Sequence, residues 1–290
     1  MDGFICVDKP TGPTSFSVTN TVRKVFKTKK AGHAGTLDPM ASGLLLVALG
    51  KCTRLLQYLS LEPKVYEFSI SFGRSTDTLD AEGEVIASSD VYPSRQELVD
   101  ISKKFLGEQQ QLPPVYSAIK IGGKPAYKFA RQGVEVELNP RLINIFSLEL
   151  SGYVDNGLQA DFVVSCSSGT YVRSLARDIV KMAGAEGFVS RLRRNQTGLF
   201  NLSQSIDYQN LENASKYIIP PHEAFNDSQK IILNDDQEKE VLIGKDIKLD
   251  VEISENFLIA FNKNSELTAV LRKTDGRNYH PERVFCVLLF

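Results

Sequence analysis

Hydrophobic side chains alternate with polar ones or gather in short runs along most of the chain, and this patterning predicts its strands. Aromatic or aliphatic residues share one face from 64 to 73, and the apolar run from 44 to 50 is unbroken. Alternation is typical of a half-buried strand, and a short apolar run is typical of a buried one. Further strands are predicted at 3–8, 83–87, 115–121, 141–152 and 157–167.

Apolar residues three and four positions apart predict the helices. One helix is expected after Thr14 or Ser15, and the clearest one opens at 168–173. A capping box formed by Ser94 and Glu97 opens a third. Shorter helices are predicted at 52–59, 125–133 and 206–227, and an extended linker is predicted at 109–114.

A change of pattern near residue 228 predicts two domains. Long strands and amphipathic helices fill 1–228, whereas 229–290 holds short strands and ends in an apolar segment. A chain of 290 residues is long enough to bury one large core and one small one. We therefore expect a large domain over 1–228 and a small β domain over 229–290.

Composition and charge narrow the class of protein. Hydrophobic residues make up 42% and charged residues 24% of the chain, as is ordinary for a globular protein. No apolar run approaches the roughly 20 residues of a membrane-spanning helix. The net charge is −1, but residues 1–60 carry +5 and residues 206–290 carry −5. The positive end suits attraction of phosphate, although a similar imbalance occurs in enzymes that bind no nucleic acid.

The cysteines and histidines are too scattered to form a metal site. The four cysteines contain no C-x-x-C pair, and the three histidines are as widely scattered along the chain. Such cysteines are typical of a reducing compartment. The first residues lack the basic start and cleavage site of a signal peptide. These observations predict a cytoplasmic protein that holds no metal and enters no membrane.

A glycine-rich loop at 31–45 holds a single carboxylate, Asp38. Its glycines and proline disfavour a regular helix and favour a shaped loop. An aspartate before a proline often only caps a turn, and turn statistics alone favour that interpretation. A buried carboxylate needs a nearby cation to stay ionised. Arg173, at the start of the clearest helix, is the best candidate, and its alternative is a surface pair with Asp178 or Glu186.

Two segments resemble the signature motifs of the TruB family of pseudouridine synthases. They are GHAGTLDP at 32–39 and CSSGTYVR at 166–173, within a similarity that covers about residues 3–200. The family isomerises a uridine in the T-loop of transfer RNA, at tRNA position 55. The resemblance implies that Asp38 is the nucleophile and that Arg173 pairs with it. The sequence leaves open whether Asp38 attacks the ribose or the base, or takes a ribose proton.

The resemblance also implies roles around the flipped base. KVYE at 64–67 is similar to the family's strand with the active-site tyrosine, so Tyr66 is expected to stack on the base and transfer its proton. Tyr171 and Leu192 match positions that contact the uridine. His33 matches a histidine that helps to displace the flipped base. Without the resemblance, Tyr66 and Leu192 would be assigned to the core and His33 to a structural hydrogen bond.

Two basic residues, Lys120 and Arg131, lie in segments that look like family segments and are expected to face RNA. The implied fold is α+β, the pseudouridine synthase fold, with a long mixed or antiparallel sheet, flanking helices and a central cleft. Many family members end in a PUA-type RNA-binding domain. Residues 229–290 have about the right size for a PUA-like module, but the negative charge of this end suits phosphate poorly.

The implied reaction needs no redox change, hydrolysis or phosphate energy, so no cofactor is expected. The expected partner is the T-arm of tRNA, bound by a monomer. The main alternative is a non-catalytic RNA-binding or RNA-folding protein on the same scaffold, against which the presence of Asp38, Tyr66 and Arg173 argues. A glycoside or nucleoside hydrolase would need a second carboxylate near Asp38, which the sequence does not identify. A guide-RNA-dependent relative of the dyskerin type would be expected to carry basic tails.

Overall fold

The computed structural model describes residues 1–117, 119–130, 132, 134, 136–154, 157–250 and 256–285. A ten-stranded mixed sheet forms its main part. The strands of this sheet are β1 (Gly3–Lys9), β2 (Ala31–Ala34), β3 (Ser42–Leu49), β4 (Lys64–Phe72), β7 (Gly107–Gln111), β10 (Arg141–Tyr153), β11 (Gln159–Cys166), β12 (Gly187–Thr197), β13 (Phe200–Asn201) and β14 (Ile206–Asp207). They follow the order β14-β1-β3-β12-β4-β11-β10-β7, with β2 beside β3 and β13 beside β12.

The sheet consists of two halves that meet at a short parallel junction. Strands β1, β2, β3 and β14 form one half, and β4, β11, β10 and β7 form an antiparallel half. Strand β12 joins the halves, because it pairs antiparallel with β4 and parallel with β3. The parallel contact spans only two residue pairs, Arg193 with Ser42 and Arg194 with Gly43. The loop that carries Asp38 enters β3 at this junction.

Three helices bury their apolar faces against the sheet. Helix α1 (Ser15–Val25) packs Val18 and Val22 on the β1–β3 half. Helices α2 (Arg95–Lys103) and α4 (Val172–Met182) pack on the other half, in one core cluster with β4, β10, β11 and β12. Thr14 caps α1, and Ser94 with Glu97 forms the predicted capping box of α2. No helix among the described residues has the length and apolar composition that crossing a membrane requires.

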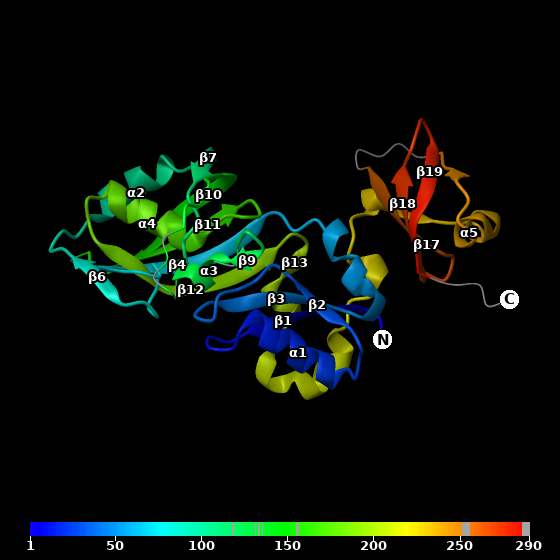
Figure 1. Cartoon of the computed structure of the whole chain (residues 1–290), viewed down its shortest axis with the longest axis horizontal. Coiled ribbons are helices and arrows are strands. Elements are labelled where there is room, and N and C mark those ends of the chain that lie inside the picture. Colours follow the sequence, from blue (N-terminus) through cyan, green and yellow to red (C-terminus); the bar gives the residue numbers. More distant parts are fainter. Residues whose placement is uncertain are drawn as a thin grey trace.

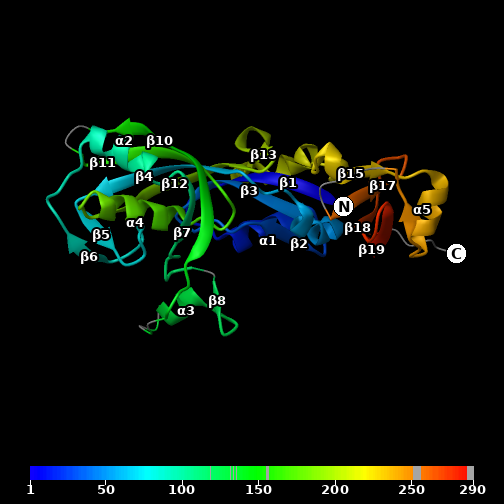
Figure 2. The ribbon, with the colours of Figure 1, turned by 90° about the horizontal axis from the view of Figure 1, so that it is seen from above.

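A small segment projects from the face of the sheet that α1 and α4 cover (Figure 2). It contains β8 (Lys120–Ile121), β9 (Lys124–Pro125) and α3 (Ala126–Ala130). A second short hairpin, β5 (Arg74–Thr76) with β6 (Val85–Ser88), lies at the end of the molecule where α2 and α4 pack (Figure 1).

The C-terminal part forms a separate five-stranded sheet at the other end of the molecule (Figure 1). Its elements are β15 (Lys230–Ile232), α5 (Asp235–Leu242), β16 (Ile247–Lys248), β17 (Phe257–Phe261), β18 (Leu267–Lys273) and β19 (Asn278–Val284). Phe257 of this sheet packs its ring 5.0 Å from that of Tyr58. Because one apolar cluster contains residues of both parts, the boundary between 1–228 and 229–290 stays a prediction.

Several predicted elements differ from the structure. The extended linker expected at 109–114 is wrong for 109–111, because Gly107–Gln111 pairs with β10 as the edge strand β7, whereas 112–114 lie outside any helix or strand. Among the described residues of the strand expected at 115–121, only Lys120–Ile121 pairs in a ladder. The helix expected at 52–59 is two 3₁₀ turns, Gly50–Arg54 and Leu56–Tyr58. In each case pairing with distant segments or tight packing outweighs the local pattern.

At Gly43 of β3, the backbone of β12 comes very close. We therefore expect a substitution there to lower the stability of the protein strongly. The φ of Gly43 is +100°, and a Cβ added there would overlap the carbonyl oxygen of Arg194 and lie 2.8 Å from the Arg194 nitrogen. We expect Gly43→Ala to lower the free energy of unfolding by about 3 kcal/mol, because backbone strain and overlap add. Urea denaturation would measure this loss.

Gly107 provides the matched control, because its φ is +89° and no atom lies within 4 Å of an added Cβ. Gly107→Ala therefore carries the backbone strain without the overlap, and its expected cost is about 1 kcal/mol. Equal losses for the two variants would contradict the close approach at Gly43.

Candidate active site

Asp38 lies on the loop of residues 35–41, and side chains from outside this loop form hydrogen bonds with its backbone. The buried Lys9 ammonium donates to the carbonyls of Ala41 at 2.6 Å and Pro39 at 3.2 Å. The Ser15 hydroxyl bonds both the nitrogen and the carbonyl of Leu37. The main chain of the loop is therefore fixed before any ligand arrives, which favours catalysis by a preorganised group.

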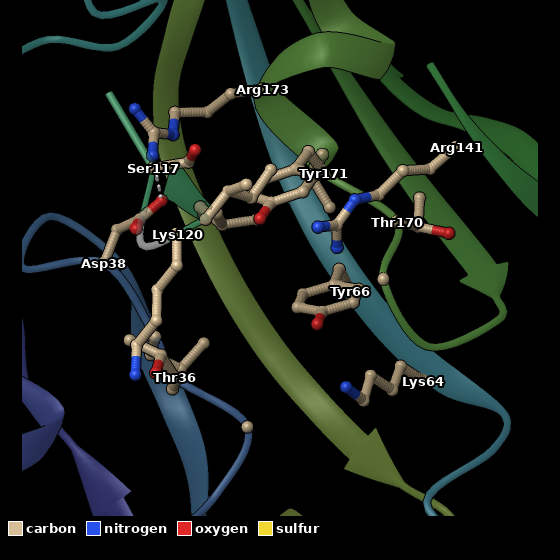
Figure 3. A pocket seen from close by; sticks show the side chains of 16 residues that line it. Thr36, Asp38, Lys64, Tyr66, Ser117, Lys120, Arg141, Thr170, Tyr171 and Arg173 are labelled. Atoms are coloured by element: carbon tan, nitrogen blue, oxygen red, sulfur yellow. Dashed lines mark ion pairs between the residues drawn. The ribbon is translucent and has the colours of Figure 1, made fainter. Parts of the chain in front are cut away.

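The Asp38 side chain forms an ion pair and does not cap its turn. Its Oδ2 lies 2.8 Å from Nη2 of Arg173, and the turn itself is closed by the backbone bond from Ala41 to Asp38. The Asp38 side chain remains 35% exposed, whereas Arg173 is only 5% exposed. The carboxylate thus presents one side to solvent and the other to a buried guanidinium (Figure 3).

A second carboxylate, Asp80, forms an ion pair with the other side of the Arg173 guanidinium. The Arg173 Nη1 lies 3.1 Å from Asp80 Oδ2 and donates to the carbonyl of Thr78 at 2.8 Å. Asp80 is buried and also accepts from the hydroxyl of Thr78 and the backbone nitrogen of Glu82. It does not line the cavity described below. Its place behind Arg173 fits an orienting group and does not fit the second acid of a hydrolase.

Burial raises the pKa of the Asp38 carboxyl above its usual value of 3.8. The Arg173 guanidinium opposes this rise, and the negative charge of Asp80 adds to it. Lys9 is a more distant cation that also favours the ionised form. Arg173 and Asp80 therefore act on Asp38 in opposite directions, and the protonation of Asp38 depends on both neighbours.

A cavity of about 450 Å³ opens beside Asp38. Tyr66 of β4, Leu192 of β12 and Tyr171 at the start of α4 contribute to its wall. Tyr66 and Leu192 are largely buried, so each presents one face to the cavity. Gln111 bonds the backbone nitrogen and carbonyl of Tyr171, at 2.8 and 3.1 Å. The volume falls within the range of small-ligand sites, and the aromatic rings suit a flat heterocycle.

Basic side chains line the same cavity. Lys120 and Arg141 are exposed, and Lys64 is buried. Arg194 lies behind the wall, fully buried, and donates to the carbonyls of Leu44 and Gly35. Its positive charge opposes the rise that burial causes in the pKa of the Tyr66 phenol. Positive charge thus surrounds a cavity whose wall contains one acid, Asp38, among the described residues.

Two predicted site residues do not reach the cavity or cannot be placed. His33 lies on β2 and is not part of the described cavity wall. Its Nδ1 is buried without a hydrogen-bond partner, and burial lowers the pKa of its imidazole. Arg131 lies outside the described residues. The roles of both residues stay predictions.

Sequence reasoning missed Lys9, Asp80 and Arg194. Each is a charged residue in a segment whose pattern is ordinary: the end of a strand, an acidic turn and a basic segment. All three are nearly inaccessible to solvent in the structure. No local signal marks a buried charge, since its partners come from distant parts of the chain. Among the described residues, no group of three or more histidine, cysteine or acidic side chains could hold a metal ion.

Comparison with known proteins identifies the family of this chain. Residues 23–172 match the family described as TruB family pseudouridylate synthase (N terminal domain). A tRNA pseudouridine synthase B of Caulobacter sp. strain K31 is 40% identical over 255 residues, covering 86% of this chain and 82% of the relative. The enzyme of the same name from Dehalococcoides mccartyi strain 195 is 36% identical over 293 residues, covering 98% and 97%.

Solved structures share the fold. A chain of an H/ACA ribonucleoprotein, bound to a substrate RNA containing 2′-deoxyuridine, superimposes with a TM-score of 0.72 and 25% identity. The match covers 98% of this chain and 85% of that one. It confirms the predicted α+β fold with its long mixed sheet. From its motifs, its fold and these relatives, the chain belongs to the TruB family of pseudouridine synthases.

Proposed function

We propose that this protein converts a uridine of tRNA into pseudouridine, at position 55 in the T-loop, as a monomer and without a guide RNA. The relatives at 36–40% identity are named as tRNA pseudouridine synthases, which supports tRNA as the substrate. The observation that carries the proposal is the Asp38–Arg173 ion pair at the rim of a cavity that Tyr66 and Tyr171 line. A protein that only bound RNA would have no need of a carboxylate held in this way.

The chemistry follows from the geometry of the cavity. The bond from ribose C1′ to base N1 must break, and the base must rejoin through C5. An ionised carboxylate can trap the electron-poor sugar or base, or can take a ribose proton. Arg173 orients Asp38 and favours its charge. Both routes begin from the same ionised Asp38, so the roles of the two residues do not depend on the choice between them.

The base must leave the RNA stack to reach Asp38. Tyr66 is proposed to stack on the flipped base and to transfer its proton, and the charge of Arg194 favours ionisation of its phenol. Tyr171 and Leu192 are proposed to enclose the base, and Lys120 is proposed to contact RNA from the cavity rim. His33 and Arg131 keep their proposed roles in base displacement and RNA contact.

The test is pseudouridine formation on an unmodified T-arm hairpin whose target uridine carries tritium at C5. Isomerisation replaces the C5–H bond by a C–C bond, so tritium release counts turnovers. We expect release from the hairpin with no added RNA or cofactor, and none when a cytidine labelled at C5 replaces the uridine. Absence of release from the uridine hairpin by the unaltered protein would contradict the proposed function.

The pH dependence of that reaction is expected to show an acid limb above pH 3.8. Burial raises the pKa of Asp38, and only the ionised form can act. Activity should therefore be complete above this raised pKa and fall as the pH decreases through it. Single-turnover rates between about pH 4 and 8, which includes the range in which folded proteins are usually most stable, would locate the limb.

A further inference from the structure

Lys64 is a buried cation that has no partner among the residues that the structure describes. Its side chain lines the cavity and is only 9% exposed. Within the described part of the chain, its ammonium makes no hydrogen bond and no ion pair within the 4.0 Å limit for such pairs. An ammonium group carries three donors, and leaving such a group buried and unpaired is costly. The position of Lys64 therefore needs an explanation.

The other buried cations of the site are all satisfied. Arg173 contacts two carboxylates and two carbonyls. Lys9 donates to three backbone carbonyls. Arg194 donates to two carbonyls, those of Leu44 and Gly35. Lys64 alone among these four residues points into the cavity without an acceptor, which indicates that its acceptor is a ligand.

The wall beside Lys64 is shaped to leave room at the ammonium. Gly35, with a φ of +78°, exposes its α-carbon there, and a Cβ at this position would lie 3.3 Å from Nζ of Lys64 and 3.4 Å from Nη1 of Arg194. Two positive groups thus converge on one glycine. Burial and, to a smaller extent, the positive charge of Arg194 lower the pKa of Lys64, and the weaker influence of Glu62 does not offset them.

The only acid in the described cavity wall cannot supply that charge. Asp38 is engaged with Arg173. Figure 3 draws Lys64 apart from this pair, with Tyr66 between them in that view. Arg141 lines the same cavity and is free of ion pairs among the residues that the structure describes. An anion that reaches the Tyr66 side of the cavity would find in Lys64 a buried cation without an acceptor among the described residues.

We propose that Lys64, at the Gly35 wall of the cavity, is a subsite for one phosphodiester of the RNA strand beside the target uridine. The inference rests on the proposed function, because it takes RNA as the ligand. Every nucleotide brings one phosphate, and the flipped nucleotide must carry its backbone past the cavity mouth. Lys64 then fixes the depth to which the sugar enters, on the side opposite to Asp38.

Binding of the T-arm hairpin to Lys64→Met tests this directly, with no turnover needed. We expect the Kd to rise about tenfold, because a charge-assisted hydrogen bond is lost. The slope of log K against log salt should decrease by roughly 0.7 to 0.9, because one phosphate contact is removed. Lys239→Met, at an exposed lysine of α5, is the matched control and should change neither quantity.

A neutral methylphosphonate, placed at each linkage next to the target uridine in turn, identifies the phosphate. At one linkage it should weaken binding by the unaltered protein and should not weaken binding by Lys64→Met any further. Thermal unfolding separates this role from a structural one, because removal of an unpaired buried cation should leave the melting temperature equal or higher.

Each contrary outcome has a distinct meaning. Equal affinity of Lys64→Met for the hairpin, additive losses from lysine and phosphate, or a lower melting temperature would each overturn the subsite. Tight hairpin binding with these contrasts, but without tritium release, would contradict the proposed reaction and leave the phosphate contact standing. Absence of hairpin binding by the unaltered protein would overturn both.

Discussion

Replacing Asp38 by asparagine is expected to reduce the rate of pseudouridine formation by about 10⁴-fold or more, the scale on which loss of a nucleophile acts. The amide has nearly the shape of the carboxylate and can still accept from Arg173, so the loop should keep its structure. What is lost is the negative charge that attacks the substrate or takes its proton. Single-turnover tritium release from the T-arm hairpin would measure the loss.

RNA binding separates this chemical defect from a folding defect. The loop backbone is held by Lys9 and Ser15, neither of which contacts the Asp38 carboxylate in the structure. The Kd of Asp38→Asn for the hairpin is therefore expected to stay within about threefold of that of the unaltered protein. Such a change in free energy is about the size that an exposed substitution causes. Asp90→Asn, in an exposed loop, is the matched control for both measurements. A variant with substantial turnover would remove Asp38 from the mechanism.

The strands that could be predicted are those whose pattern is local. The alternation at 64–73 corresponds to β4, and the capping box at Ser94 opens α2 as expected. Strand β12 was missed, because its sequence carries charges on both faces and includes the buried Arg194. Its extended state comes from its ladders with β4 and β3. Such pairing is a tertiary effect that no local propensity contains.

The candidate site divides in the same way. Asp38, Tyr66 and Arg173 could be proposed because they lie in recognisable motifs, and the structure brings all three to one cavity. Asp80 and Lys64 could not be proposed from the sequence, because their roles depend on which residues lie beside them in the folded protein. Asp80 matters because Arg173 lies 3.1 Å away. Lys64 is informative because no acceptor lies near it in the described structure, a fact that only packing can reveal.

Arg173→Met should strongly impair both the chemistry and the stability of the protein. The substitution leaves the buried Asp80 without its cation and two carbonyls, of Thr78 and Tyr116, without their donor. Breaking a buried pair from one side costs about 3 kcal/mol of unfolding free energy. We expect the rate of pseudouridine formation to fall by roughly 10³-fold, on the scale of lost electrostatic stabilisation, and hairpin affinity to change much less. Urea denaturation and single-turnover assays would measure these effects.

The acid limb of the pH profile gives the sharpest check, because the two neighbours of Asp38 shift it in opposite directions. Arg173 lowers the pKa of Asp38 and Asp80 raises it. Since activity falls as Asp38 takes up a proton, Arg173→Met should move the limb to higher pH and Asp80→Asn should move it to lower pH. Equal losses of hairpin affinity and rate in Arg173→Met, with an unmoved limb, would instead make Arg173 a phosphate contact. Opposite movements of the limb would assign it to Asp38, the carboxylate that shares Arg173 with Asp80.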